Sequence, residues 1–142
     1  MTKLDQLKSL LKDLQDLSTA CVLLDWDLKT ETPKYGVDAV VRSLTALSTK
    51  SFELSISPQM EELVYALNEE EEYAKLDAIW QKAVRRMKKD FDENKRIPVD
   101  FYSEFVENRA KAEAVWQEAK QNNDFASFAP YLEKNIANAI QI

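Results

Sequence analysis

The segment KLDQLKSLLKDLQDLSTACVLL, residues 3–24, decides the fold class of this chain. Its apolar residues recur at steps of three and four, which is the spacing of one face of an α-helix. They are Leu4, Leu7, Leu11, Leu14, Leu17, Cys21 and Leu24. Charged residues lie on the other side, at Lys3, Lys8, Lys12 and Asp13. The segment therefore predicts an amphipathic helix from Lys3 to Leu24.

The remainder of the chain continues this pattern. Apolar spacing and helix-start signals predict further helices over Val37–Leu54, Pro58–Leu67, Glu70–Asn94 and Val99–Gln121, and a last helical region that follows Asn123-Asp124. Ser57-Pro58 suits a helix start, because serine accepts from the free amides and proline tolerates the first helical position. Only a short link at Ile97-Pro98 joins the two longest helices, so we expect them to pack as an antiparallel hairpin.

The composition supports an all-α fold. The 142 residues include one glycine, whereas all-β domains need many tight turns and therefore more glycine. A length of this order suits one domain with its own hydrophobic core. We therefore predict that residues 1–142 form a single multi-helix domain with a long antiparallel helical hairpin.

The net charge and the cysteine content limit which classes of partner and which cellular compartment are expected. The formal net charge is −6, whereas nucleic acids are bound through clustered lysine and arginine, so no nucleic-acid partner is expected. Cys21 is the only cysteine, which favours a reducing compartment. Met1–Leu10 carries polar residues throughout, and no apolar run approaches the ~18 residues of a membrane span. We expect a cytoplasmic protein with no membrane partner.

Catalytic chemistry is restricted by the absence of histidine. Without it, neither a Ser-His-Asp nor a Cys-His arrangement can form, and the commonest zinc ligand is missing. Cys21 lies on the apolar stripe of the first helix, where a buried thiol is expected rather than a nucleophile. A single glycine provides no phosphate-binding loop. The sequence therefore predicts no catalytic, cofactor-binding or metal-binding residue.

Two charged segments are the remaining candidates, one for paired carboxylate chemistry and one for partner binding. Glu69–Glu72 are consecutive, so their side chains point around a helix and are expected to form a solvated helix start. Gln81–Arg96 carries seven bases against three acids, which is sufficient to attract an acidic partner. A solvated helix end is the interpretation we favour for this segment.

Asp25-Trp26-Asp27 is the most distinctive short motif. With the following residues to Gly36 it has no clean helical period, and Pro33 disfavours helix at Thr32, so we expect a surface connection. Trp26 is expected to fill the core while the aspartates accept hydrogen bonds from nearby amides. The alternative is a binding or interface element. Trp80 and Trp116 are likewise expected to be largely buried.

Three pieces of the sequence resemble the carboxypeptidase Taq family of zinc metallocarboxypeptidases. The first is Leu24-Asp25-Trp26-Asp27 followed by Thr30, Pro33, Gly36, Leu44 and Leu47-Ser48. The second is Ile97-Pro98, which opens a helix that reaches Trp116. The third is Trp116 and Ala119 followed by Asn123-Asp124-Phe125, Phe128, Pro130 and Leu132-Glu133-Lys134. The resemblance covers nearly the whole chain but only the opening part of the family's sequence.

The resemblance implies a mostly helical, cytoplasmic enzyme, often homodimeric, that removes residues from the C-termini of peptides. Its zinc would lie on a His-Glu-x-x-His helix that is not within this chain, so no catalytic or zinc-binding role transfers to any residue here. What transfers is a set of helices that flank or cover the substrate groove. We expect the chain alone to lack zinc and to be inactive, with the peptide substrate binding only in the full enzyme.

The expected partner is the catalytic portion of the parent enzyme or a second copy of the chain. Apolar spacing continues to the final residue, which suits a truncated enzyme. Residues expected to lose packing partners there are Tyr131, Ile136, Ile140 and Ile142. The alternative function is that of a stand-alone helical module for self-association or protein interaction.

Overall fold

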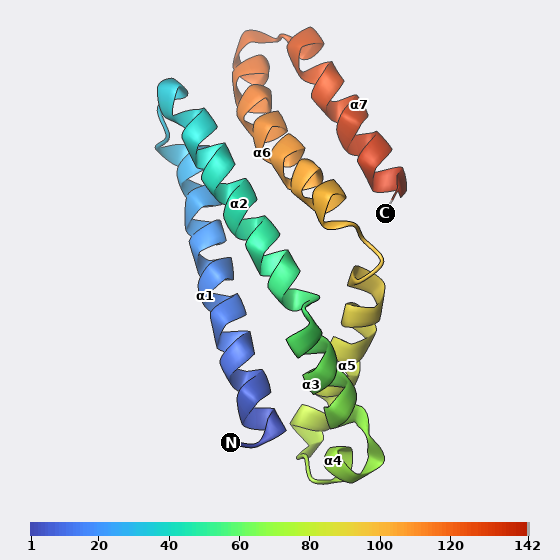
Figure 1. The fold of residues 1–142 in the computed structure, drawn as a ribbon. Coiled ribbons are helices and arrows are strands. Elements are labelled where there is room, and N and C mark those ends of the chain that lie inside the picture. The colour runs from blue at the N-terminus through green and yellow to red at the C-terminus, as the bar shows by residue number, and fades with distance from the viewer. Residues whose placement is uncertain (142) are drawn as a thin grey trace.

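A computed structural model describes residues 1–141, and helices account for nearly all of that range (Figure 1). The all-α prediction is confirmed. The helices are α1 (Lys3–Thr30), α2 (Val37–Ser55), α3 (Pro58–Asn68), α4 (Glu70–Ala74), α5 (Ala78–Asn94), α6 (Val99–Asn122) and α7 (Phe125–Gln141), with a short 3₁₀ turn η1 (Lys34–Gly36) before α2. Ile142, which we expected to be exposed, lies outside the described residues.

Two antiparallel pairs run side by side along the molecule. Figure 1 shows α1 beside α2, and α6 beside α7, with α2 and α6 adjacent in the middle. The smaller helices α3, α4 and α5 gather at the end where α1 begins. None of the helices described here is both long and apolar enough to cross a lipid bilayer.

The apolar core is unevenly distributed between the two ends. A large cluster joins α1, α3 and α5 through Leu7, Leu10, Met60, Leu63, Val64, Leu67, Val84 and Phe91. A smaller cluster joins the second half of α1 to α2 and α6 through Leu28, Val41, Leu44 and Ala110. α6 contributes only the small side chain of Ala110 to the second cluster.

α1 is longer than the sequence suggested, which corrects the placement of Asp25-Trp26-Asp27. These residues belong to the helix, which ends at Thr30 rather than Leu24. Leu28 is buried and continues the stripe of Cys21 and Leu24, so packing against α2 extends the helix by more than a turn. The restriction from Pro33 acts only on Thr32, which lies beyond the helix end.

Residues 70–94 form two helices instead of one. α4 ends at Ala74, and the Asp77 carboxylate accepts hydrogen bonds from the backbone N–H groups of Ile79 and Trp80, each at 2.9 Å. This N-cap starts α5 anew, since a capping aspartate satisfies amides that have no partner within the helix. The side chain of Gln81 then bonds the carbonyl oxygens of Tyr73 and Leu76 and closes the break.

The predicted hairpin between the helices that meet at Ile97-Pro98 is wrong. α5 packs against α3, whereas α6 packs against α2 and α7. The apolar face of α5, including Val84 and Phe91, is taken up by the large core cluster and has no surface left for α6. The antiparallel hairpins of the fold are instead α1–α2 and α6–α7.

The burial predicted for the tryptophans is also wrong in part. Trp80 is half-buried against the large core, but Trp116 is 40% exposed and Trp26 is 69% exposed. Trp26 projects from the side of α1 opposite Leu28. An apolar side chain on a helix face with no neighbouring element remains in solvent whatever its hydrophobicity.

Candidate functional site

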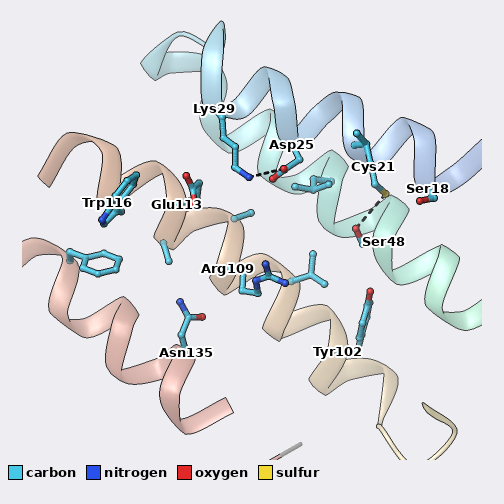
Figure 2. Close-up of a pocket in the computed structure, with 16 residues that line it drawn as sticks. Ser18, Cys21, Asp25, Lys29, Ser48, Tyr102, Arg109, Glu113, Trp116 and Asn135 are labelled. Carbon is cyan, nitrogen blue, oxygen red and sulfur yellow. Dashed lines mark hydrogen bonds and ion pairs between the residues drawn. The ribbon is translucent and has the colours of Figure 1, made fainter. Parts of the chain in front are cut away.

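A groove of about 720 Å³ lies between α1 and α6, with α2 at its floor and α7 at one side (Figure 2). α1 and α6 both pack on α2 but make few contacts with each other, so the space above α2 stays open. We call this hollow the α1–α6 groove. It carries several polar and charged side chains on facing helices, and it is therefore the candidate site.

The α1 wall presents an ion pair. Lys29 Nζ lies 2.8 Å from Asp25 Oδ2, one helical turn away, and the hydrogen bond to that carboxylate raises the pKa of Lys29. Both side chains remain substantially exposed, so the pair contributes little to stability. Asp25 of the predicted motif thus faces the groove, whereas Asp27 accepts a hydrogen bond from Thr32 Oγ1 at the helix end.

The floor of the groove holds the only cysteine. Cys21 Sγ lies 3.4 Å from Ser48 Oγ on α2, and both residues are half-buried. Figure 2 shows the Tyr102 side chain across the groove with its hydroxyl directed toward Ser48, and burial raises the pKa of that hydroxyl. Cys21 therefore lies at the edge of the core and contacts the groove.

The α6 wall carries a cation and an anion one turn apart. Neither Arg109 nor Glu113 has an ion-pair partner among residues 1–141. The guanidinium of Arg109 lies over the ring of Phe105, 5.6 Å from its centroid, and Figure 2 shows it turned toward the groove. The groove therefore holds two charges on α6 that make no ion pair among residues 1–141, although Glu113 lies close enough to Lys29 for its charge to raise the pKa of that lysine.

Aromatic and amide side chains close the α7 side. Trp116 and Phe128 line the groove and also line a second hollow of about 400 Å³ with Phe125, so the two hollows adjoin. Deeper in the hairpin, buried Asn108 donates to Asn135 Oδ1 at 2.6 Å. This hydrogen bond fixes Asn135 at the groove surface.

Trp116→Ala is expected to lower the free energy of unfolding by only about 1–2 kcal/mol. Removing a fully buried aromatic side chain typically costs about 3–5 kcal/mol, but Trp116 is 40% exposed and therefore buries less apolar surface. Urea unfolding, followed by circular dichroism, measures the difference in the free energy of unfolding between the variant and the unsubstituted chain. A loss of the full buried value would contradict the position of Trp116 at the groove surface.

Several charges of the two segments singled out in the sequence are paired within the chain. Glu71 and Glu72 both pair with Lys75. Within residues 81–96, Arg86 pairs with Asp90 and Lys88 with Asp92, while Lys89 and Lys95 pair with glutamates. No three potential metal ligands converge in the part of the chain that the structure describes.

The sequence interpretation missed Lys29, Arg109, Glu113 and Asn135. The signal that was present is a charged pair inside an apolar stripe: Tyr102, Val106, Arg109, Glu113 and Trp116 follow one another at steps of three and four on α6. A helix face that mixes apolar residues with a charged pair in this way differs from a core face, which is apolar, and from a solvated face, which is polar.

The sequence and the fold are similar to those of known metallopeptidases. Residues 6–142 match the family model of the carboxypeptidase Taq (M32) metallopeptidases. Carboxypeptidase 1 of Bacillus subtilis is 41% identical over 127 residues, which is 89% of this chain and 25% of that protein. Thermostable carboxypeptidase 1 of Pyrococcus furiosus is 31% identical over 117 residues, covering 82% of this chain and 23% of that protein.

A solved structure agrees. The crystal structure of BsuCP superposes with a TM-score of 0.92 at 38% identity, over 97% of this chain and 27% of that one. The chain therefore belongs to the carboxypeptidase Taq family of metallopeptidases, as the resemblance in the sequence indicated. It spans about a quarter of the length of the curated relatives that it matches.

Proposed function

We propose that this chain is the N-terminal helical portion of a cytoplasmic zinc metallocarboxypeptidase that removes C-terminal residues from peptides. Its helices flank or cover the substrate groove, and its partner is the catalytic portion of the same enzyme. The observation that carries the proposal is the match of residues 6–142 to the family, together with a TM-score of 0.92 to BsuCP. Peptide substrate binds only in the full enzyme.

The chain by itself is proposed to hold no zinc and to be inactive. Protein zinc sites use histidine, cysteine and carboxylate ligands at close quarters. This sequence has no histidine and one cysteine, and Cys21 has Ser48 rather than a carboxylate as its close polar neighbour. The donors present do not fit a zinc site, so the metal chemistry belongs to the rest of the enzyme.

We expect the purified chain to retain substoichiometric zinc after dialysis and to leave a test peptide intact. The positive counterpart is a chimera in which this chain replaces the aligned segment of Bacillus subtilis Carboxypeptidase 1. That chimera is expected to bind zinc and to shorten the peptide from its C-terminus. Zinc by atomic absorption and products by mass spectrometry provide the two readouts. Stoichiometric zinc with trimming by the chain alone, or a folded but inactive chimera, would refute the proposal.

A stand-alone self-association module is the second candidate. The observation that favours it is the exposure of Val22, Leu23 and Trp26 on one side of α1, since contiguous exposed apolar residues mark interaction surfaces. Light scattering across a wide concentration range separates the two functions. A stable dimer of the isolated chain favours the module, and a monomer that is active only within the chimera favours the enzyme portion.

A further inference from the structure

We propose that the α1–α6 groove, together with the adjoining hollow at Phe125, is the surface on which the catalytic portion of the enzyme packs. This inference rests on the proposed function and names the face through which the two portions meet. The competing faces are the outer side of α1, the convex side of α2 and α6, and the surface of α3–α5.

Exposed apolar side chains border the groove on both walls. Val22 projects from α1, while Trp116 and Phe125 project from the α6–α7 hairpin on the opposite side. Trp26 follows Val22 one turn along α1, so the apolar border extends beyond the groove. Exposed apolar side chains that gather on facing walls mark a surface that another molecule or segment covers.

The two charges on the α6 wall of the groove are available to a partner. On α5, Arg86, Lys88 and Lys89 each pair with an acid one turn away. Arg109 and Glu113 are one turn apart as well, but neither pairs within residues 1–141. Burying such charges is favourable only when opposite charges meet them. The partner is therefore expected to present an acidic group to Arg109 and a basic group to Glu113.

The length of the relatives identifies the occupant. This chain superposes over 97% of its length on BsuCP yet covers only 27% of that chain. The same arrangement of helices therefore exists inside a chain several times longer, whose remaining residues are covalently joined to it. A covalent neighbour meets a surface at a high effective concentration, which a separate peptide or a second copy lacks.

Side-chain footprinting tests the assignment. Hydroxyl-radical oxidation is measured residue by residue in the isolated chain and in the Bacillus chimera described above. We expect oxidation of Val22, Trp116 and Phe125 to fall at least about fivefold in the chimera, because buried side chains are shielded from the solvent radical. Iodoacetamide labelling of Cys21, which lines the groove, is expected to slow by a similar factor. Ile79, 78% exposed on α5, is the matched control and should be unchanged.

A charge swap gives an independent measurement. The double substitution Arg109→Glu with Glu113→Arg exchanges the two groove charges. It keeps the composition of the chain but reverses the order of positive and negative charge along the α6 wall. We expect the melting temperature of the chimera to fall by several degrees, with a change of no more than about one degree in the isolated chain. The control exchange, Arg86→Asp with Asp90→Arg, should affect neither protein.

The outcomes separate this inference from the proposed function. An active chimera in which Val22, Trp116 and Phe125 stay as reactive as in the isolated chain would overturn the inference alone. An inactive, folded chimera with a protected groove would overturn the proposed function alone. Protection of the groove in the isolated chain at high concentration, or on addition of a test peptide, would assign the surface to a second copy or to substrate and overturn the inference. If the chimera does not fold, footprinting of unmodified Bacillus subtilis Carboxypeptidase 1 at the aligned positions decides the same question.

Discussion

Replacing Phe52 with alanine is expected to lower the free energy of unfolding by about 3–5 kcal/mol, the cost of removing a buried aromatic side chain. Phe52 on α2 is buried and stacks on Tyr102 of α6, with ring centroids 4.0 Å apart and planes within 9°. The substitution leaves a cavity at the contact that joins the two antiparallel pairs. Urea unfolding followed by circular dichroism gives the difference from the unsubstituted chain.

Phe52→Leu is the control for that experiment. Leucine fills part of the cavity, and hydrophobic replacements that keep most of the volume usually cost less than about 1.5 kcal/mol. A small loss for Phe52→Leu with a large loss for Phe52→Ala would identify packing volume as the cause. Equal, small losses for both would show that the stacked contact does not hold α6 against α2.

Leu7→Ala is expected to cost about 2–5 kcal/mol, the range for leucine in a well-packed core. Leu7 is completely buried where α1 meets the large cluster around Val64 and Leu67. Leu23→Ala is the matched control on the same helix: Leu23 is 65% exposed, and surface substitutions usually change stability by less than about 0.5 kcal/mol. Both are measured by urea unfolding. Similar losses at the two positions would contradict the orientation of α1.

Helix positions were largely predictable because apolar spacing is a local property. The stripe of residues 3–24 identified α1, and Ser57-Pro58 and Ile97-Pro98 marked the starts of α3 and α6. The errors arose where short-range signals conflict. Leu28 extends the stripe of α1, but Pro33 and Gly36 favoured a connection. The capping role of Asp77 depends on its hydrogen bonds, which no spacing rule supplies.

Which helices pack together could not be predicted from the length of the links between them. The connection at Ile97-Pro98 is short enough for a hairpin, yet α5 finds its apolar partner in α3. The groove also depends on this packing between distant segments, because it forms only when α1 and α6 both pack on α2. The sequence excluded histidine-based chemistry, but it gave no means of bringing Lys29, Arg109 and Asn135 together.

The uneven core implies that the molecule behaves as two cooperative units joined by shared helices. α1 and α2 run through both, but α3–α5 rest on the large cluster while the α6–α7 hairpin rests on α2 through Ala110 of the smaller cluster and the stacking of Tyr102 on Phe52. Regions with fewer buried apolar contacts open at lower free energy than the molecule as a whole. Because fewer buried apolar side chains hold it, we expect the hairpin to open before the other end of the chain, and its opening would remove one wall of the groove.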